Sequence, residues 1–408
     1  MTASRDRVRE AVEAAFRDEW GQVVATLIGL TGDWDLAEEC AQDAFARALT
    51  TWPRDGVPRR PGAWLTTAAR NRATDRLRRD AAGAAKLRQL AVLARDQDEP
   101  PSGVIPDGRL ELIFTCCHPA LPFPARVALT LRTLAGLSTN EIARAFLTAE
   151  SAMAQRLVRA KRKIAEAGIP YRVPPAELLP GRLAAVLAVL YLIFNQGYTD
   201  AGGDAARALT AEAIRLTRVL VRLMPDEPEP RGLLALMLLH DARRATRTDD
   251  GVLVTLEHQD RSRWDRELIT EGTALLDRAL AARRAGPYQV QAAIAACHAT
   301  APDVAHTDWP QIVTLYGELA RLAPSPVVDL NRAVAVAMAD GVKAGLALVD
   351  ELTASGRLAG YHLLPATRAD LLRRDGRTAE AREAYEEALR LAPPEADRRY
   401  LTGRLEEL

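Results

Sequence analysis

The residues best suited to chemistry in this sequence are clustered arginines and lysines, and the chemistry that they suit is the binding of phosphate groups. The clearest cluster lies in residues 124–164, where the apolar spacing predicts helix, helix, turn and helix. Ser138 and Glu141 have the spacing of a capping box, which would start the second helix, and Thr148 could cap the last one. A short helix, a tight turn and a basic helix are what reading of the DNA major groove requires.

The last helix of this cluster would bury Met153, Leu157 and Ile164 against its neighbours. That burial leaves a more exposed, polar and basic face made of Ser151, Gln155, Arg156, Arg159 and Lys163. The first turn of such a helix meets base edges, and arginines and lysines further along meet phosphates. A basic helix that faces solvent in an ordinary bundle has the same pattern, so the motif alone leaves both interpretations open.

A second basic stretch, residues 61–80, begins with a proline, which is typical of a helix N-terminus. Leu65, Ala69, Ala73 and Leu77 recur every four residues and would form a buried stripe. Another face carries the polar residues Asn71, Arg72, Asp75, Arg76 and Arg79, with Trp64 at the helix entry. Such a helix could bind phosphates and stack its tryptophan on an unpaired base, or it could simply expose an arginine face to water.

An acidic helix is predicted at residues 35–49, before the basic stretch at 61–80. Its face carries Glu38, Glu39 and Asp43, close to the apolar Cys40 and Phe45. The carboxylates are either ordinary solvated charge or a surface on which a basic protein partner docks.

The other groups of candidate residues are interpreted as structural. Cys116, Cys117 and His118 follow an apolar run and lack a second ligand pair at zinc-like spacing, so they are interpreted as core residues at a helix end. Opposite charges at 258–265 surround Trp264 and predict a structural ion-pair network. The sequence has no phosphate-binding glycine loop, nucleophile elbow or pair of catalytic carboxylates, so it predicts no enzyme, no cofactor and no metal site.

The elements that must position these residues are predicted to be helices throughout, so the expected fold class is all-α. One short extended piece is predicted at 252–257. Breaks rich in proline and acidic residues divide the chain. The expected domains are residues 1–93, a flexible linker at 94–108, a helix-turn-helix domain at 109–170 and a C-terminal helical domain at 175–408.

The C-terminal block has the pattern of paired helices. Residues 376–393 have the small, aromatic and terminating residues of a tetratricopeptide-like hairpin, namely Gly376, Ala381, Tyr385, Ala388, Leu389 and Pro393. Residues 327–352 predict a second hairpin with a turn at Asp340 and Gly341. No strict repeat runs through the block, so an irregular helical solenoid or bundle is predicted.

The composition predicts a soluble, cytoplasmic protein. Lys plus Arg and Asp plus Glu are both 54 in 408 residues, so any nucleic-acid binding must come from local patches. The four cysteines suit a reducing cytosol, and the charged N-terminus does not resemble a signal peptide. The most apolar run, residues 183–194, is shorter than the ~20 residues of a membrane span. It is therefore predicted to be a buried core helix.

The order of these elements resembles that of bacterial sigma factors of the extracytoplasmic-function type, which join a sigma-2 to a sigma-4 domain. Residues 35–45 are similar to the sigma-2 segment that docks on polymerase, residues 61–79 to the segment that melts and reads the −10 element, and residues 137–164 to the sigma-4 reader of the −35 element. The long tail is similar to that of the subgroup with a C-terminal tetratricopeptide-like extension. The matching stretches along the chain include RPGAWL, FTCCHPAL, LEHQDRSRWD, GPYQVQAAIAACHA and SPVVDLNRAVAVA.

The resemblance implies a protein that binds core RNA polymerase, at its β′ clamp and β flap, and directs it to promoter DNA without catalysing a reaction itself. The docking residues would be Glu38, Glu39, Gln42 and Asp43. The −10 contacts would be Trp64, Asn71, Arg72, Arg76 and Arg79. The −35 contacts would be Ser151, Gln155, Arg156, Arg159, Lys161 and Arg162. Acidic side chains would face the polymerase and basic side chains the DNA, so we expect the two surfaces to be separate.

The C-terminal domain would regulate this activity or recruit a partner, for which a small YCII-like protein is a candidate. Two other classes remain open. A one-component helix-turn-helix regulator would sense a ligand through the helical tail and bind an operator without polymerase. A tetratricopeptide-like adaptor would have no DNA role and would leave both basic helices unexplained.

Overall fold

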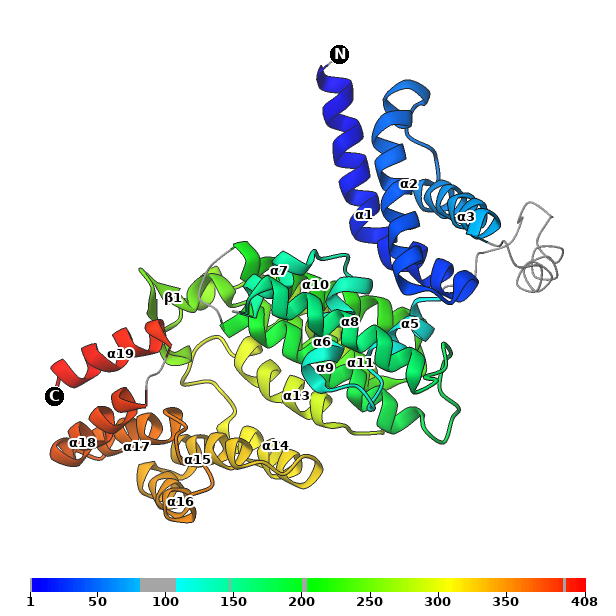
Figure 1. Ribbon diagram of the computed structural model, residues 1–408. Coiled ribbons are helices and arrows are strands. Elements are labelled where there is room, and N and C mark those ends of the chain that lie inside the picture. Colours follow the sequence, from blue (N-terminus) through cyan, green and yellow to red (C-terminus); the bar gives the residue numbers. More distant parts are fainter. Residues whose placement is uncertain (1, 81–107, 147, 200–203, 392–393) are drawn as a thin grey trace. The chain divides into compact units, whose positions relative to one another are not determined.

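The computed structural model is helical in almost every part that it describes (Figure 1), which confirms the predicted all-α class. The described residues are 2–80, 108–146, 148–199, 204–391 and 394–408. The predicted linker at 94–108 lies outside them, apart from Gly108. The chain divides into two compact units, Met1–Gln196 and Gly197–Leu408, and this break comes later than the boundary expected near residue 175.

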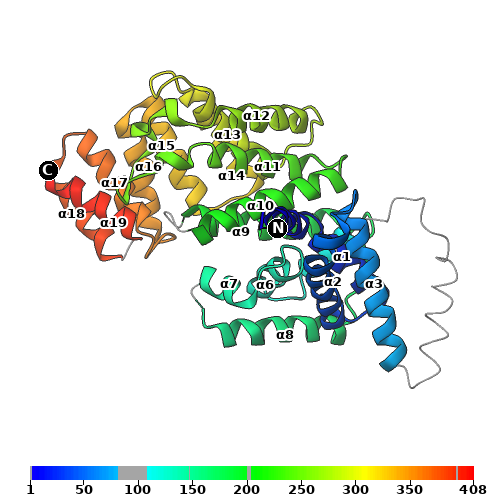
Figure 2. The same cartoon turned by 90° about the horizontal axis from the view of Figure 1, so that it is seen from above.

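Three helices begin the N-terminal unit: α1 (Thr2–Thr31), α2 (Trp34–Asp55) and α3 (Pro61–Asp80). The first two lie side by side and the third packs against both (Figure 1, Figure 2). Asp33 caps α2, because its carboxylate accepts hydrogen bonds from the backbone N–H groups of Asp35 and Leu36 at 2.9 and 3.0 Å. The predicted stripe on α3 is confirmed for Leu65, Ala69 and Ala73, which are fully buried, whereas Leu77 is only half-buried.

Four shorter helices follow among the described residues of the same unit: α5 (Arg109–Cys116), α6 (Phe123–Thr133), α7 (Thr139–Ala145) and α8 (Glu150–Glu166). The capping box is confirmed: the N–H of Glu141 donates to Ser138 Oγ at 3.2 Å, and the N–H of Ser138 donates to the Glu141 carboxylate at 2.7 Å. The prediction that Thr148 caps α8 is wrong. Its N–H instead donates to the carbonyl of Ala143 at 2.9 Å, which continues the turn after α7 and leaves Ala149 at the N-cap.

The apolar run at 183–194 lies inside α9 (Leu179–Thr199), a helix longer than the run itself. By length and composition alone α9 could cross a membrane, a test that core helices of soluble proteins also pass. Val186, Val189, Ile193 and Phe194 are fully buried. This burial agrees with the predicted core helix.

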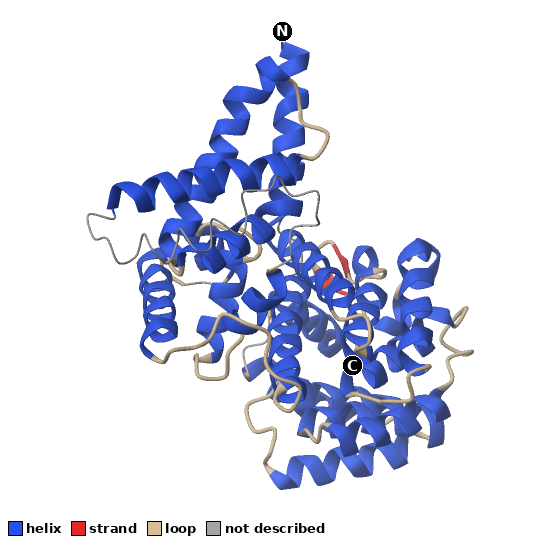
Figure 3. Cartoon of the chain, turned by 90° about the vertical axis from the view of Figure 1, so that its right-hand side faces the viewer, coloured by secondary structure: helices blue, strands red, loops and turns tan. Residues whose placement is uncertain are grey.

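Where it is described, the C-terminal unit is a succession of helices with one pair of two-residue strands (Figure 3). Its elements are α10 (Asp204–Leu223), α11 (Pro228–Asp241), η1 (Arg244–Thr246), β1 (Thr248–Asp249), β2 (Val252–Leu253), η2 (Leu256–His258), η3 (Arg261–Arg263), α12 (Arg266–Leu280), α13 (Pro287–Thr300), α14 (Trp309–Leu322), α15 (Pro326–Asp340), α16 (Val342–Ser355), α17 (Leu363–Arg374), α18 (Thr378–Arg390) and α19 (Glu395–Glu406). The predicted extended piece is therefore confined to β2, and the chain turns into η2 after it.

Both predicted helix pairs are present. The chain reverses at Gly341 between α15 and α16 and at Gly376 between α17 and α18, each with a positive φ that glycine adopts readily. The small residues Ala381 and Ala388 are fully buried on α18, together with the ring of Tyr385. Small side chains at these positions allow close helix packing.

The charges at 258–265 do not form the expected ion-pair network. Asp265 caps α12, and Asp260 caps η3. Arg261 donates to the carbonyls of His298 and Ala301 and lies 4.9 Å from the centre of the Trp264 ring. These charges instead satisfy backbone groups at helix ends: the first N–H groups of η3 and α12, and carbonyls at the end of α13.

Candidate nucleic-acid interface

The outer face of α8 is polar, basic and exposed, as the helix-turn-helix prediction requires. Met153, Leu157, Ala160 and Ile164 are buried. On the other side of the helix the exposed candidates are Ser151, Gln155, Arg159 and Arg162, and Arg156 is partly exposed. The hydrophobic stripe fixes the rotation of α8, and the rotation presents these groups to solvent.

A basic hollow of about 480 Å³ borders this face where α8 passes the start of α6. The cations that line it are Arg156, Arg159, Arg162 and Lys163, and its acidic residue, Glu166, lies 3.3 Å from Arg162. The excess of positive charge suits a phosphate backbone. Lys163 is therefore a candidate contact beside those expected from the resemblance.

Lys161 lies on the opposite flank of α8 from Arg156 and Lys163, because successive residues are rotated by roughly 100° around the helix. Its Nζ donates to Glu38 at 2.9 Å and to Asp35 at 2.8 Å, and only 15% of its side chain is exposed. The lysine expected at a phosphate is thus bound to the acidic helix α2.

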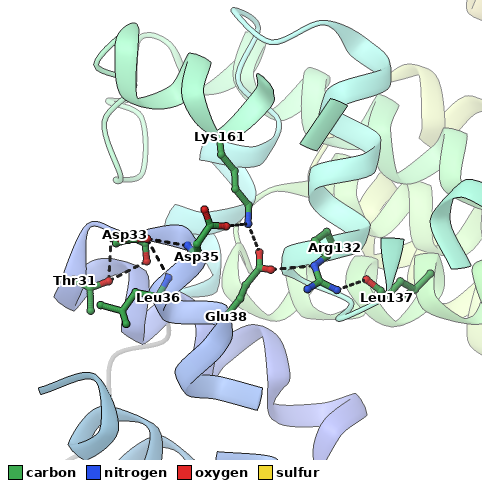
Figure 4. Close-up of polar contacts among 8 residues, drawn as sticks. All are labelled: Thr31, Asp33, Asp35, Leu36, Glu38, Arg132, Leu137 and Lys161. Carbon is green, nitrogen blue, oxygen red and sulfur yellow. Dashed lines mark hydrogen bonds and ion pairs between the residues drawn. The ribbon is translucent and has the colours of Figure 1, made fainter. Parts of the chain in front are cut away.

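Glu38 is the buried member of the acidic face. Its carboxylate accepts one hydrogen bond from Lys161 and another from Arg132 Nε at 3.0 Å (Figure 4). The exposed fractions of the side chains are 8% for Glu38 and 19% for Arg132. This carboxylate is paired on both oxygens and is removed from water.

Glu39 and Asp43 point to the other neighbour of α2, the basic helix α3. Asp43 accepts a hydrogen bond from Arg72 Nε at 2.8 Å, and Glu39 lies 3.6 Å from Arg76. All four side chains remain about half exposed. The expected separation of acidic and basic surfaces is therefore wrong for these residues, because α2 and α3 pack side by side and their charges attract.

The other candidate residues of α2 and α3 are partly or fully exposed, and among the described residues they have neither the buried ion pairs of Glu38 nor the exposed pairs of Glu39 and Asp43. Trp64 is partly exposed and sets its ring edge-on against the buried Trp52, with 5.6 Å between ring centres. Gln42, Asn71 and Arg79 are exposed. These side chains lie on the surface of the same three-helix group as the Arg72–Asp43 pair.

Comparison with known proteins assigns the two groups of helices. Sigma-70 region 2 matches residues 16–82, and Sigma-70 region 4 matches residues 111–164. The chain belongs to the sigma-70 family of RNA polymerase sigma factors. Such proteins bind core polymerase and mediate promoter recognition. Below, region 2 and region 4 denote these two matched segments.

Two further matches have printed names that give no function, one to part of the C-terminal half and one to nearly the whole chain. A family of unknown function (DUF6596) matches residues 182–280. An uncharacterized protein of Rhizobium meliloti (strain 1021) is 45% identical over 396 residues, which cover 95% of this chain and 93% of that protein. No solved structure matches the chain.

The sigma factor also holds regions 2 and 4 together through close packing. A Cβ on Gly21 would lie 2.9 Å from the carbonyl oxygen of Leu134, so α1 meets the end of α6 at backbone distance. Just beyond region 4, the hydroxyl of Tyr171 donates a hydrogen bond to the carbonyl of Ala25 in region 2 at 2.8 Å. The ion pairs of Glu38 are therefore part of a packed contact between the two regions.

Sequence reasoning missed Arg132, the second partner of Glu38. It is a charged residue near the end of the apolar helix α6, between the buried Leu131 and Thr133. A charge in such a position needs a partner, and that is the one signal that the sequence offers. It does not identify a partner 94 residues away.

The Cys116, Cys117 and His118 group behaves as core at the end of α5. Both cysteines are buried, and burial raises the pKa of the Cys117 thiol to about 11. His118 Nδ1 accepts a hydrogen bond from the N–H of Ala120 at 3.1 Å. These contacts agree with the structural role predicted for the group.

The C-terminal unit contains a cavity of about 240 Å³ whose lining includes His298, Arg261 and Trp309. Burial, with Arg243 and Arg261 nearby, lowers the pKa of His298 to about 4. Burial also lowers the pKa of His240 well below its usual value. Near pH 7 this unit therefore buries the imidazoles of His240 and His298 uncharged, whereas regions 2 and 4 bury the ion pairs of Glu38.

Proposed function

We propose that this sigma factor is of the extracytoplasmic-function type and directs promoter-specific initiation through the −10 and −35 elements. The observation that carries the proposal is the presence of a region 2 and a region 4 in one chain, each a compact helical group with basic side chains at its surface. Polymerase docking falls to the acidic side of α2, with Glu39, Gln42 and Asp43 exposed and Glu38 beside them.

The −10 contacts fall to α3. Arg72, Arg76 and Arg79, with Asn71, would hold the melted strand, and Trp64 at the start of the helix would stack on an unpaired base. The pairs that Arg72 and Arg76 make with α2 are exposed, and exposed pairs are worth only about 0.2–1 kcal/mol. Polymerase and DNA would therefore displace them at little cost.

The −35 contacts fall to the outer face of α8. Ser151, Gln155 and Arg156 occupy its first turns and would meet base edges, while Arg159 and Arg162 would meet phosphates beside the basic hollow. Lys161 would join them only after it leaves Glu38 and Asp35. Arg159 and Arg162 already face solvent, which supports phosphate contact by these two residues without any change in α8.

The C-terminal unit would act in the cytoplasm as a tetratricopeptide-like regulatory domain that acts on transcription or recruits a small YCII-like protein. The helix pairs α15–α16 and α17–α18, with their small buried residues, support a hairpin architecture of this kind. Truncation of this unit should change promoter output. Unchanged output would contradict both roles.

Run-off transcription with purified core polymerase tests the main proposal. Addition of the full-length chain should give a transcript that depends on a specific promoter sequence, and core polymerase alone should not. The absence of a transcript from every candidate promoter, or tight operator binding by a dimer without polymerase, would contradict it.

A further inference from the structure

The cavity of about 240 Å³ lies entirely within the C-terminal unit, because all of its lining residues belong to that unit. Its walls are mostly apolar or aromatic. They include Trp309 and Ile312 of α14, and Val334, Ala335 and Met338 of α15. Binding sites for small organic molecules have walls of this kind, with a few polar groups that fix the orientation of the ligand.

Arg261 brings a buried charge to this cavity. The residue is 8% exposed, and its Nη1 donates to the carbonyls of His298 and Ala301 at 2.6 and 2.8 Å. A guanidinium has five N–H groups, and the edge formed by Nε and Nη2 has no acceptor within the described ranges. An edge of this kind can bind both oxygens of a carboxylate.

The charge of Arg261 has no counter-ion at contact distance among the residues that the structure describes. The carboxylate that acts on it from further away is Asp303, which is hydrogen-bonded to His306 at 2.7 Å. The other arginine of the lining, Arg374, forms an ion pair with Glu257, which also lines the cavity. Because a buried charge is costly without a partner, an anion in this cavity would be stabilised.

The imidazole of His298 adds a polar group without adding charge. Its ring packs edge-on against Trp309, with 5.2 Å between ring centres. Burial and the nearby arginines lower the pKa of His298 to about 4, so the ring is neutral near pH 7. A neutral imidazole has one donor and one acceptor and leaves Arg261 as the group that selects for negative charge.

A neighbouring cavity of about 250 Å³ shares part of this lining but has the opposite balance of charge. Three carboxylates line it against two arginines, namely Glu257, Asp370 and Asp397 with Arg374 and Arg404. An anion is therefore favoured in the cavity of Arg261 and disfavoured in its neighbour.

The volume of the cavity at Arg261 limits the occupant to one small molecule. A protein cavity of about 150 Å³ is large enough to bind benzene. The volume here, about 240 Å³, therefore has room for a single ring or a short alkyl chain together with a carboxylate.

We propose that this cavity binds a small organic acid, whose carboxylate pairs with the Nε and Nη2 edge of Arg261 and whose apolar body lies against Trp309 and Met338. The site goes beyond the proposed role in transcription and does not depend on it. A bound acid stabilises the folded C-terminal unit by mass action, because the buried guanidinium gains a counter-ion.

Calorimetric titration of the full chain tests the site with benzoate, 3-phenylpropionate and hexanoate, each compared with its primary amide. The acids should bind. The amides should bind at least about tenfold more weakly, because they keep the shape and lose the charged partner of Arg261. Absence of binding by all three acids, or equal affinities of acid and amide, would overturn the proposal.

Two variants with matched controls locate the bound acid. Val334→Phe places a larger side chain in the cavity and should weaken binding at least about tenfold, whereas Val327→Phe makes the same change at an exposed position of α15 and should not. Arg261→Gln should bind acid and amide equally, whereas Arg263→Gln, at an exposed position of the same η3, should keep the preference for the acid.

Wild-type affinity in Val334→Phe, or an unchanged preference for the acid in Arg261→Gln, would also overturn the proposal. The helix content of each variant, measured by circular dichroism, shows whether it has folded. If a variant does not fold, the comparison of acid with amide on the wild-type chain still decides.

Discussion

Both sides of α2 carry acidic side chains, but on one side the carboxylate is buried and on the other side the carboxylates are exposed. Glu38 lies against region 4, is almost fully buried and pairs with cations 94 and 123 residues further along the chain. Glu39 and Asp43 lie against the neighbouring helix α3, where their side chains remain 53% and 43% exposed. Their partners belong to the same three-helix group.

The difference shows that the place of a carboxylate on a helix, rather than its charge, decides what it can do in the free protein. An exposed pair is screened by water and salt and exchanges partners at little cost. A buried pair cannot lose one partner cheaply. Glu38 is therefore a structural residue of the free chain, and Glu39 and Asp43 are the carboxylates that can exchange partners at little cost.

The largest expected effect comes from Glu38→Gln, which keeps the shape of the side chain and removes its charge. Arg132 and Lys161 would keep their burial and lose their counter-ion. We expect the free energy of unfolding of the N-terminal unit to fall by about 3 kcal/mol, measured by urea unfolding of the full chain. Glu39→Gln should change it by less than about 0.5 kcal/mol. Equal effects of the two substitutions would remove the distinction between the two sides.

Acid should lower the stability of the C-terminal unit, because this unit buries an uncharged histidine. The comparison of buried and exposed charged groups on α2 thus extends to a group that is buried without charge. The pKa of His298 is about 4 in the folded protein, below its usual value of 6.5. The unfolded chain therefore binds more protons between these values, so stability is lost as the pH falls from 6.5 towards 4. The loss from this group is about 3 kcal/mol. In His298→Gln the dependence of the unfolding free energy on pH should be flatter over this range, and an unchanged slope would contradict the assignment.

Substitutions of two glycines of α1 distinguish the closely packed contact with α6 from a position that has room for a side chain. Gly21→Ala would place a Cβ 2.9 Å from the carbonyl oxygen of Leu134 and should destabilise the protein by about 1–3 kcal/mol. Gly29→Ala has only an ordinary contact, 3.5 Å from the ring of Tyr171, and should stabilise the helix by about 0.5–1 kcal/mol. Thermal unfolding should therefore shift in opposite directions. A shift of both in the same direction would argue against close packing of α1 on α6.

The smallest effect is expected for the exposed pair of Arg72 and Asp43. A double-mutant cycle with Arg72→Ala and Asp43→Ala should give a coupling free energy below about 1 kcal/mol, and added salt should reduce it. The matching cycle with Arg132→Met and Glu38→Gln should give a larger value with a weaker salt dependence. A coupling for the exposed pair as large as for the buried one would break the comparison.

Local patterns in the sequence predicted much of this structure. The hydrophobic spacing on α3 and α8, the capping box at Ser138 and the turns at Gly341 and Gly376 depend on residues close together in the chain. The partners of Glu38 could not be predicted this way, because they meet it only after α2, α6 and α8 have packed. The pairing of Asp43 with Arg72 was missed for the same reason: it depends on the side-by-side packing of α2 and α3.

The proposed polymerase-docking surface is formed by the exposed carboxylates of α2, and charge reversal tests this assignment most directly. The measurement is the affinity of the full chain for core polymerase with Glu39→Lys and Asp43→Lys combined. The control is Glu10→Lys with Glu13→Lys, which reverses two exposed charges on α1. We expect at least a tenfold loss of affinity, about 1.4 kcal/mol, for the first variant at unchanged helix content, and wild-type affinity for the control. Wild-type affinity in the first variant would contradict it.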